Sequence, residues 1–397
     1  MNKSELINKS KEVFINTYSQ LPIIIESGEG VYVKDTDGNK YLDFVAGIAV
    51  NCLGYKNKNL INQITKQLNK FTHCSNLYYN EPSILAAELL VNVSGLDKVF
   101  FCNSGAEAME SALKLSRKYG YKYKNGSYEI ITMKNSFHGR TFGAITATGQ
   151  EKYQKGLKPL LPGIKYASYN NIESIENLIC DKTCAIVVEP KQGEGGIKPS
   201  NENFLKDLRL VCDKNNIVLI FDEVQCGIGR TGKMFAYQKY GIKPDIVALA
   251  KGLGGGFPVG AIIACNKVSN AFEPGDHATT YGGNPLVTTA VNTVLSEIIN
   301  KDILKNVRKS GAYLKQNLDE LKNRYDYITE VRGEGLMLGM ELSINVKSII
   351  IDCIKQGLLL INAGLNVIRF VPPLIVNKHE IDEAILKLEN VLKEVKG

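Results

Sequence analysis

The sequence predicts an α/β protein with two parts: a large domain built on a mainly parallel sheet, and a smaller α+β domain assembled from both ends of the chain. Three observations support this prediction. Short apolar runs alternate with amphipathic stretches through the middle of the chain. These runs are continuously apolar, which is typical of strands covered on both faces. The two flanks differ, because the first carries a hairpin signal and the second mixes helices with short strands.

The length of the chain favours two domains. A chain of 397 residues exceeds what one hydrophobic core usually organises. We predict that residues 1–50 form an N-terminal segment contributing to the small domain, that residues 51–285 form the large domain, and that residues 286–397 form the C-terminal small domain. The large domain should hold the ligand, because it contains the parallel sheet.

The N-terminal hairpin signal comes first along the chain. Short strands are predicted at residues 30–33 and 41–43, on either side of an acidic turn with a glycine at residues 35–39. The sheet of the large domain follows. Five apolar runs are predicted as its strands, at residues 98–102, 129–133, 185–188, 217–221 and 246–249.

Helices are predicted between and after these strands. Residues 104–119 and 204–211 place apolar side chains at helical spacing, which predicts a doubly wound arrangement around the sheet. After Pro285 the pattern changes to a long helix. Short strands follow at residues 337–341 and 367–370 and belong to the smaller domain.

Composition excludes several classes of protein. The net charge is +7, but the lysines are spread along the chain, so nothing indicates nucleic-acid binding. The positive balance favours anionic small molecules such as carboxylates and phosphates. No apolar stretch is long enough to cross a membrane, and the N-terminus resembles no secretory signal. We therefore expect a cytoplasmic protein.

The cysteines indicate neither a disulfide framework nor a metal site. The chain has nine, and the closest pair is Cys180 with Cys184, without the second pair that a zinc site needs. Reduced thiols are the usual state in the cytoplasm.

Three polar residues end consecutive predicted strands: Glu189, Asp222 and Lys251. They lie about thirty residues apart, the length of one βαβ unit each. Alone, each acid could simply cap a helix, and the lysine could end a strand at the surface. Because the carboxyl ends of parallel strands meet at one edge, we expect the three to converge on one crevice.

The chemistry of this set suits a lysine that forms a Schiff base beside a carboxylate that pairs with a cationic ring. A lysine desolvated at a strand end has a lowered pKa and can form a Schiff base. A buried Asp222 needs a cationic partner, and a protonated pyridine nitrogen would serve. Gln225 could donate to a phenolic oxygen on the same ring, and Val224 could pack on a ring face.

Further candidates lie at two other strand ends. Ser104 is a predicted N-cap, and free amides at a helix start bind phosphate. Phe137 offers an aromatic face for stacking. Arg140 and Arg369 offer planar forks for carboxylates, although arginines near strand ends often form surface ion pairs.

One motif argues for a different function and is rejected. Residues 227–232, GIGRTG, match the dinucleotide-binding pattern G-x-G-x-x-G. That turn must follow its strand directly, but here residues 222–226 intervene. An oxidoreductase is therefore not predicted.

Taken together, these segments resemble the class III, ornithine-type, pyridoxal-phosphate-dependent aminotransferases. The resemblance covers nearly the whole chain in order and rests on six segments: NSGAEA (103–108), FHGR (137–140), EPKQGEGG (189–196), FDEVQ (221–225), KG (251–252) and TTYGGNP (279–285). Within the class, residues 41–51 and 75–79 are most similar to the enzymes that act on acetylornithine.

The resemblance implies a fold type I enzyme with pyridoxal 5′-phosphate as its cofactor. Lys251 would bind the cofactor covalently and later move the proton between the substrate carbon and the cofactor, while Asp222 would pair with the ring nitrogen. The other residues implied to bind the cofactor are Ser104, Gly105, Ala106, Phe137, Glu223, Val224, Gln225 and Thr280. Thr280 would reach the phosphate of the neighbouring subunit, which implies a homodimer.

The resemblance also implies the substrates. The δ-amino group of N2-acetylornithine would pass to 2-oxoglutarate, giving N-acetylglutamate 5-semialdehyde and glutamate. Arg140 would hold a substrate carboxylate, and Arg369 would hold the α-carboxylate of glutamate, with Glu194 neutralising it until the dicarboxylate arrives. Tyr18 and Thr279 are further residues implied to bind substrate.

Departures from the family pattern leave the amine donor open. Residues 54–58, GYKNK, stand where relatives usually show a histidine-rich segment, and Met109 stands where asparagine is common. Ile48 replaces a tyrosine of ornithine aminotransferases, which favours an acylated amine. Ornithine, succinylornithine, 4-aminobutyrate and acetyl-lysine remain alternatives, as does a non-catalytic protein that binds pyridoxal phosphate.

Overall fold

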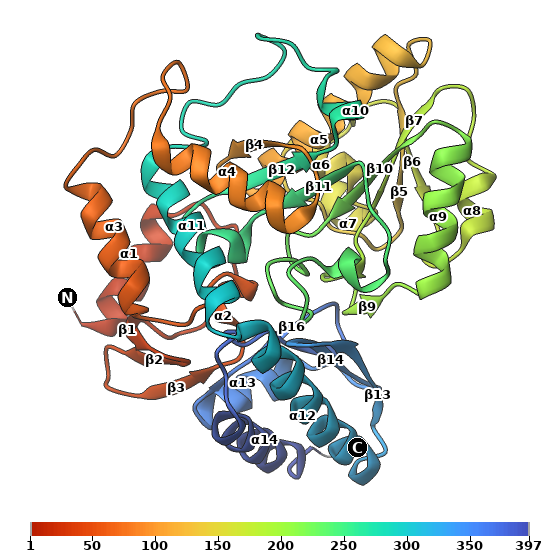
Figure 1. Ribbon diagram of the computed structural model, residues 1–397. Coiled ribbons are helices and arrows are strands. Elements are labelled where there is room, and N and C mark those ends of the chain that lie inside the picture. The colour runs from red at the N-terminus through yellow and green to blue at the C-terminus, as the bar shows by residue number, and fades with distance from the viewer. Residues whose placement is uncertain (1, 396–397) are drawn as a thin grey trace.

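The computed structural model describes residues 2–395. Its centre is a seven-stranded sheet with helices on both faces (Figure 1). The strands that lead to Glu189, Asp222 and Lys251 are neighbours in this sheet. In order across the sheet they are β4 (Lys98–Cys102), β12 (Gly260–Ala264), β11 (Ile246–Leu249), β10 (Val218–Asp222), β7 (Thr183–Val188), β5 (Glu129–Met133) and β6 (Ile164–Ala167).

The sheet is mainly parallel, as predicted. Strands β11, β10, β7, β5 and β6 pair in parallel, and only β12 runs against its two neighbours. All five predicted strands are present, with ends that differ by up to two residues. Strands β6 and β12 were not predicted. Residues 260–264 are as apolar as the other strands, but hydrophobic pattern alone does not give the direction of a strand.

Helices cover this sheet and connect its strands. The predicted helix at residues 104–119 is α5 (Gly105–Tyr123), which starts at a Ser104 N-cap. The helix predicted at residues 204–211 is α9 (Glu202–Lys214). The remaining helices of this region are α3 (Lys58–Leu68), α4 (Glu81–Ser94), α6 (Phe142–Ala147), α7 (Glu151–Gln154), α8 (Ile172–Glu176), η1 (Ala236–Lys239), η2 (Lys251–Gly254), α10 (Asn266–Ser269) and α11 (Pro285–Asn300).

Two smaller sheets lie to one side of the large sheet. The first contains β1 (Ile25–Glu29), β2 (Tyr32–Asp35), β3 (Lys40–Asp43) and β15 (Leu358–Leu359), so the predicted N-terminal hairpin pairs with a strand from the far end of the chain. The second contains β13 (Ile328–Glu334), β14 (Met337–Leu342), β17 (Val367–Phe370) and β16 (Ile361–Asn362). A two-stranded ribbon, β8 (Lys191–Gln192) with β9 (Lys198–Pro199), reaches toward this second sheet (Figure 1).

The C-terminal helices pack beside the second sheet. They are α12 (Ile303–Arg324), α13 (Lys347–Lys355) and α14 (Lys378–Leu392), and Figure 1 shows them together at one end of the molecule. The N-terminal region adds α1 (Lys3–Val13) and the short α2 (Ala46–Ala49). The pairing of β3 with β15 supports the predicted small domain built from both termini, and we keep residues 1–50, 51–285 and 286–397 as the proposed division.

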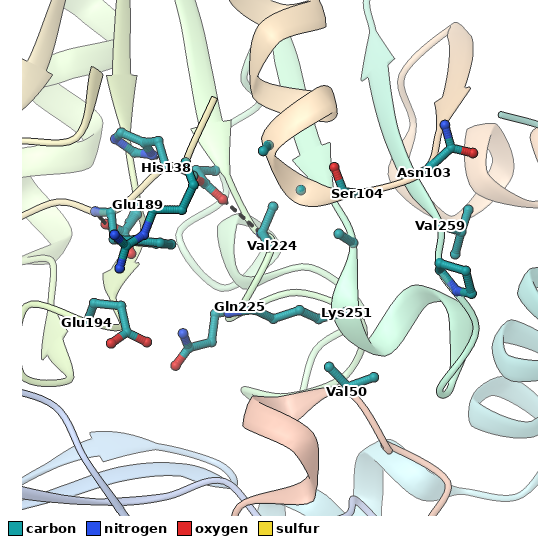
Figure 2. Close-up of a pocket in the computed structure, with 18 of the residues that line it drawn as sticks. Val50, Asn103, Ser104, His138, Glu189, Glu194, Val224, Gln225, Lys251 and Val259 are labelled. Atoms are coloured by element: carbon teal, nitrogen blue, oxygen red, sulfur yellow. Dashed lines mark hydrogen bonds and ion pairs between the residues drawn. The ribbon is translucent and has the colours of Figure 1, made fainter. Parts of the chain in front are cut away.

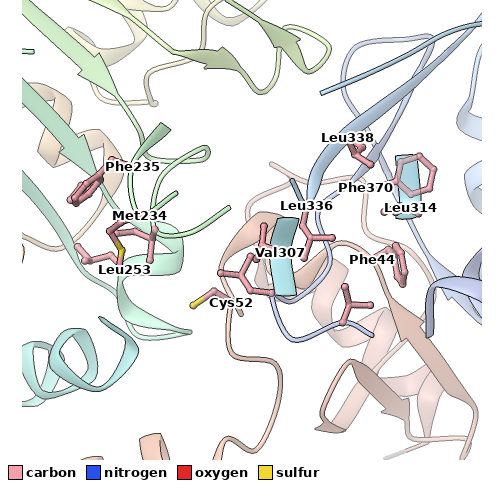
Figure 3. Close-up of a cluster of buried hydrophobic side chains, with 14 of the residues drawn as sticks. Phe44, Cys52, Met234, Phe235, Leu253, Val307, Leu314, Leu336, Leu338 and Phe370 are labelled. Atoms are coloured by element: carbon pink, nitrogen blue, oxygen red, sulfur yellow. The ribbon is translucent and has the colours of Figure 1, made fainter. Parts of the chain in front are cut away.

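The hydrophobic core runs through both parts of the chain. Its largest cluster joins Leu253 and Phe235 of the large-sheet region to Leu314, Leu338 and Phe370 of the C-terminal region (Figure 3). The two parts of the chain therefore share one continuous apolar cluster. No helix among residues 2–395 is long and apolar enough to span a membrane.

Candidate active site

A cavity of about 420 Å³ opens at the carboxyl ends of the parallel strands. Loops after β4, β5, β7, β10 and β11 all contribute to its wall, as expected for a ligand site in an α/β sheet. Figure 2 shows Lys251 extending across it toward Gln225, with Glu194 opposite and Val50 below. The predicted site residues in the wall are Ser104, Gly105, Ala106, Phe137, Arg140, Glu189, Glu194, Asp222, Val224, Gln225 and Lys251.

Lys251 begins η2 directly after β11, and its backbone is left-handed, with φ +47°. Such a conformation is costly for a residue with a side chain and is concentrated at functional sites. Burial, and then the positive charge of Arg369, lower the pKa of the Lys251 amine. Within residues 2–395 no carboxylate forms an ion pair with it. A buried lysine without an ion-pair partner and with a lowered pKa is suited to act as a nucleophile.

Asp222 lies at the end of β10 and is hydrogen-bonded from two sides. His138 Nδ1 lies 2.7 Å from its Oδ2, and the Val224 amide donates to its Oδ1 at 3.0 Å. Burial disfavours a charged imidazole, but the hydrogen bond to Asp222 raises the pKa of His138. His138 Nε2 is buried without a partner in the described chain. The pair fixes the carboxylate at the floor of the cavity.

Glu189, at the end of β7, ties together two walls of the cavity. One of its oxygens accepts from the Phe137 amide and the other from the Gly193 amide, each at 2.9 Å. Burial raises the pKa of Glu189 to about 7. Its two hydrogen bonds set the position of the Phe137 ring and of the loop that leads to Glu194.

The N-terminus of α5 faces the cavity and is suited to bind an anion. Ser104 caps the helix by accepting from the Glu107 amide at 3.2 Å, and Gly105 and Ala106, the first helical residues, line the cavity. Helix N-terminal amides and the helix dipole together attract phosphate. A side chain at position 105 would lie 2.9 Å from Val224 Cγ1, so only glycine allows this close approach.

Arg140 lies at the rim of the cavity and stacks on aromatic rings. Its guanidinium carbon is 4.2 Å from the centre of the Tyr153 ring and 5.6 Å from that of Phe137. Stacking holds the planar fork in place and leaves its N–H groups free for a carboxylate.

Arg369 lies behind the cavity wall and is paired with Glu194. Its side chain is 1% exposed, and its Nη1 contacts Glu194 Oε1 at 2.5 Å and Gln225 Oε1 at 3.1 Å. Burial opposes ionisation, but Arg369 holds the pKa of Glu194 below its ordinary value. We call this pair the Glu194–Arg369 gate. Arg369 Nε is buried without a partner in the described chain, so the guanidinium retains binding capacity.

Besides Arg369, four predicted site residues lie outside the cavity. Glu223 points away, because successive residues at a strand end face opposite sides; its oxygens accept from the Ala236 and Tyr237 amides, and burial raises its pKa to about 8. Thr279 Oγ1 accepts from Asn103, and Thr280 is exposed. Tyr18 is 81% exposed and lies on a separate groove along the N-terminal segment.

The structure adds residues that the sequence analysis did not single out. His138 lines the cavity and holds Asp222, and the Tyr153 ring lies under the Arg140 guanidinium. Val50 enters the cavity after four consecutive left-handed residues, 46–49, a run that L-residues rarely adopt. The FHGR motif was the only signal for His138, and nothing in the sequence pointed to the other two.

The departures from the family pattern and the rejected motif have structural roles. Tyr55 donates to Asp43 Oδ2 at 2.6 Å, and Met109 is fully buried in the core. In the 227–232 segment Arg230 is 2% exposed and donates to the Leu336 and Pro372 carbonyls, so this glycine-rich loop packs against the C-terminal region.

Comparisons with known proteins agree with this geometry. The Aminotransferase class-III family profile matches residues 13–392. The chain belongs to the class-III aminotransferases. It is 50% identical over 393 residues to the acetylornithine aminotransferase of Caldanaerobacter subterraneus subsp. tengcongensis, covering 98% of this chain and all of the relative.

Solved structures of aminotransferases share the fold. The ornithine aminotransferase from Toxoplasma gondii superposes with a TM-score of 0.95 at 29% identity, covering 99% of this chain and 96% of that one. The acetylornithine aminotransferase from Elizabethkingia anophelis superposes with a TM-score of 0.88 at 30% identity, with full coverage of both chains. The class-III aminotransferase described here therefore has the predicted fold, and its cofactor is pyridoxal 5′-phosphate.

The residues of the cavity fit that cofactor. An unpaired, desolvated lysine, a buried aspartate and a helix N-terminus match its aldehyde, ring nitrogen and phosphate. The volume suits a ligand of this size. We propose that Lys251, Asp222 and the α5 N-terminus hold it, with Phe137 and Val224 on the two sides of its ring.

Proposed function

We propose that this aminotransferase moves the δ-amino group of N2-acetylornithine to 2-oxoglutarate, giving N-acetylglutamate 5-semialdehyde and glutamate, a reaction of arginine biosynthesis. The observation that carries the proposal is the Glu194–Arg369 gate beside Lys251. The relatives named as acetylornithine aminotransferases support the choice of amine donor. The nine free cysteines are compatible with the cytoplasm as its compartment.

The chemistry divides between cofactor and protein. When bound, pyridoxal phosphate supplies a carbonyl that condenses with amines and a ring that accepts an electron pair. The Lys251 amine takes the proton from the amine-bearing carbon of the substrate and later returns one. Asp222, held by His138, keeps a proton on the ring nitrogen, which lets the ring draw electrons.

The gate explains how one site accepts two kinds of substrate. The amine donor reacts through an amino group far from its α-carboxylate, whereas glutamate reacts at its α-carbon. A free Arg369 would attract the carboxylate of the first substrate and misplace it. While Arg369 is paired with Glu194, its charge is neutralised and does not attract the carboxylate of the amine donor. A dicarboxylate substrate can displace Glu194, because its α-carboxylate competes with Glu194 for the Arg369 guanidinium.

Replacing Arg369 with alanine should separate the two half-reactions. We expect kcat/KM for glutamate to fall by roughly a hundredfold, because a bidentate charged contact is lost, and kcat/KM for acetylornithine to change much less. Glu194→Ala should instead favour glutamate at the expense of the amine donor. Single-turnover absorbance changes with each substrate measure both effects.

A surface arginine provides the control. Arg324 on α12 pairs with Glu389 far from the cavity, so Arg324→Ala should change neither half-reaction. Equal losses for both substrates in Arg369→Ala would refute the gate. The same assay with ornithine, succinylornithine, 4-aminobutyrate and acetyl-lysine tests the amine donor. A protein that binds the cofactor but converts none of these amines would support the non-catalytic alternative.

We also propose a homodimer in which Thr280 of each subunit reaches the phosphate of the other. Thr280 is exposed on a long loop and does not line the cavity of its own chain. Large apolar side chains are exposed beside it in the chain, on the segment whose Asn76 contacts the Thr279 carbonyl, and on the N-terminal segment: Tyr281, Leu77, Tyr78, Tyr79, Ile15 and Tyr18. A second copy of the chain would cover them.

Thr280→Val should weaken cofactor binding without dissociating the dimer. The substitution removes one hydroxyl hydrogen bond to a charged group, so we expect the dissociation constant for pyridoxal phosphate to rise about tenfold. An absorbance titration of the apoenzyme measures it, and sedimentation reports the oligomeric state. A monomeric wild-type enzyme with normal activity would contradict the proposal.

A further inference from the structure

The loop that carries Glu194, residues 193–197, is fastened to the sheet that carries Arg369. The Gly196 carbonyl accepts from Arg332 Nε at 2.8 Å. The next residue, Ile197, is fully buried although its φ is +53°. It sits over Gly339 of β14, where an added Cβ would lie 2.9 Å from the Ile197 Cβ. The loop therefore packs against β14 at Gly339, where a larger residue would clash with Ile197.

The register of this sheet explains why its side chains converge on the loop. Arg332 of β13 and Arg369 of β17 both lie opposite Gly339 of the strand between them. Directly paired residues of neighbouring strands point to the same face. Glu334 follows Arg332 by two residues on the same strand, so it shares that face too.

Glu334 forms the remaining attachment, to Lys191. The Lys191 amine lies 2.8 Å from Glu334 Oε2, and the side chain of Lys191 is 3% exposed. A lysine is almost never buried this deeply without a partner, because an unpaired charge there is costly. Lys191 lies on β8, three residues before Glu194. The ion pair thus joins the β8–β9 ribbon to the sheet of Arg369, beside the gate.

We propose that the Lys191–Glu334 pair is a positioning device that holds Glu194 over Arg369 and thereby sets the preference between amine donor and glutamate. This inference rests on the proposed function, since it concerns the same gate. Glu194 and Arg369 meet through a single close contact, 2.5 Å from Nη1 to Oε1. A small displacement of the ribbon would lengthen that contact and free Arg369 for the wrong carboxylate.

The test compares two substrates on one enzyme. In Lys191→Met the charge is lost while the length and apolar packing of the side chain are kept. We expect the ratio of kcat/KM for glutamate to kcat/KM for acetylornithine to rise about fivefold. The change has the same direction as that expected for Glu194→Ala but is smaller. The ratio does not depend on how much enzyme is folded, so a loss of stability alone leaves it unchanged. Glu334→Gln should shift the ratio in the same direction.

Lys239 offers a matched control. It contacts the other oxygen of Glu334 at 2.8 Å but is half exposed and lies outside the ribbon. Lys239→Met should leave the ratio within about twofold of the wild type, because exposed ion pairs contribute little. In a Glu194→Ala background, Lys191→Met should no longer change the ratio, since its effect passes through Glu194.

The outcomes distinguish this inference from the proposed function. If Glu194→Ala raises the ratio and Lys191→Met does not, the positioning role is overturned while the gate stands. An equal loss with both substrates in Lys191→Met, or a further shift in the Glu194→Ala background, also overturns it. If acetylornithine is not converted, the proposed donor fails, and the ratio is measured with the amine of the panel that reacts.

Discussion

Lys251→Ala should lower turnover by more than about 10⁴-fold with every amine donor, because both the covalent attachment and the proton transfer need its amine. The cofactor should still bind through its other contacts but should be removed by dialysis. In the loaded wild-type enzyme, borohydride reduction followed by peptide mass spectrometry should find the cofactor on the peptide that contains Lys251. Steady-state rates and the dialysis experiment together measure the prediction.

A charge-conserving variant separates chemistry from electrostatics. Lys251→Arg keeps a cation of similar length but offers no neutral amine at neutral pH. It should be as inactive as the alanine variant. Normal turnover in either variant, or a reduced cofactor found on a different lysine, would contradict the assignment of Lys251.

Asp222→Ala should cost about a thousandfold in kcat for both half-reactions. Loss of this carboxylate removes the group proposed to keep a proton on the ring nitrogen, so the ring should draw electrons less strongly. Asp222 is hydrogen-bonded to His138 and Val224 and not to the gate in the described chain, so the preference between glutamate and the amine donor should remain near that of the wild type. Stopped-flow absorbance in each direction measures both quantities.

His138 provides the companion measurement. It lines the cavity and contacts Asp222 at 2.7 Å, and because His138→Gln leaves the carboxylate in place, it should lower kcat less than Asp222→Ala does. In the double variant the histidine substitution should add little. An activity loss below about threefold in Asp222→Ala would show that another group pairs the ring nitrogen.

The order of the strand-end residues was predictable from the sequence. Glu189, Asp222 and Lys251 each follow an apolar run, and parallel strands bring their carboxyl ends to one edge. The N-cap at Ser104 was also predictable, because the residues that begin a helix have a recognisable local pattern. These features depend on residues close together in the chain.

The contacts that hold the strand-end residues in place depend on which strands become neighbours in the sheet. His138 meets Asp222 only because β5, β7 and β10 are adjacent in the sheet. The sequence placed Glu223 at the cofactor beside Asp222. The structure turns it toward two backbone amides instead, since the pleat alternates the direction of successive side chains.

The fold class was predictable from the sequence alone, and so were the lysine and the carboxylate that we propose for the reaction. Apolar periodicity and the residue types at strand ends are local features, so they are visible in a single sequence. The alignment of Arg332, Gly339 and Arg369 across three strands, against which the Glu194 loop packs, was visible only in the folded chain. That alignment depends on the register between strands distant in the sequence, and register is set by packing of the whole sheet rather than by any local pattern.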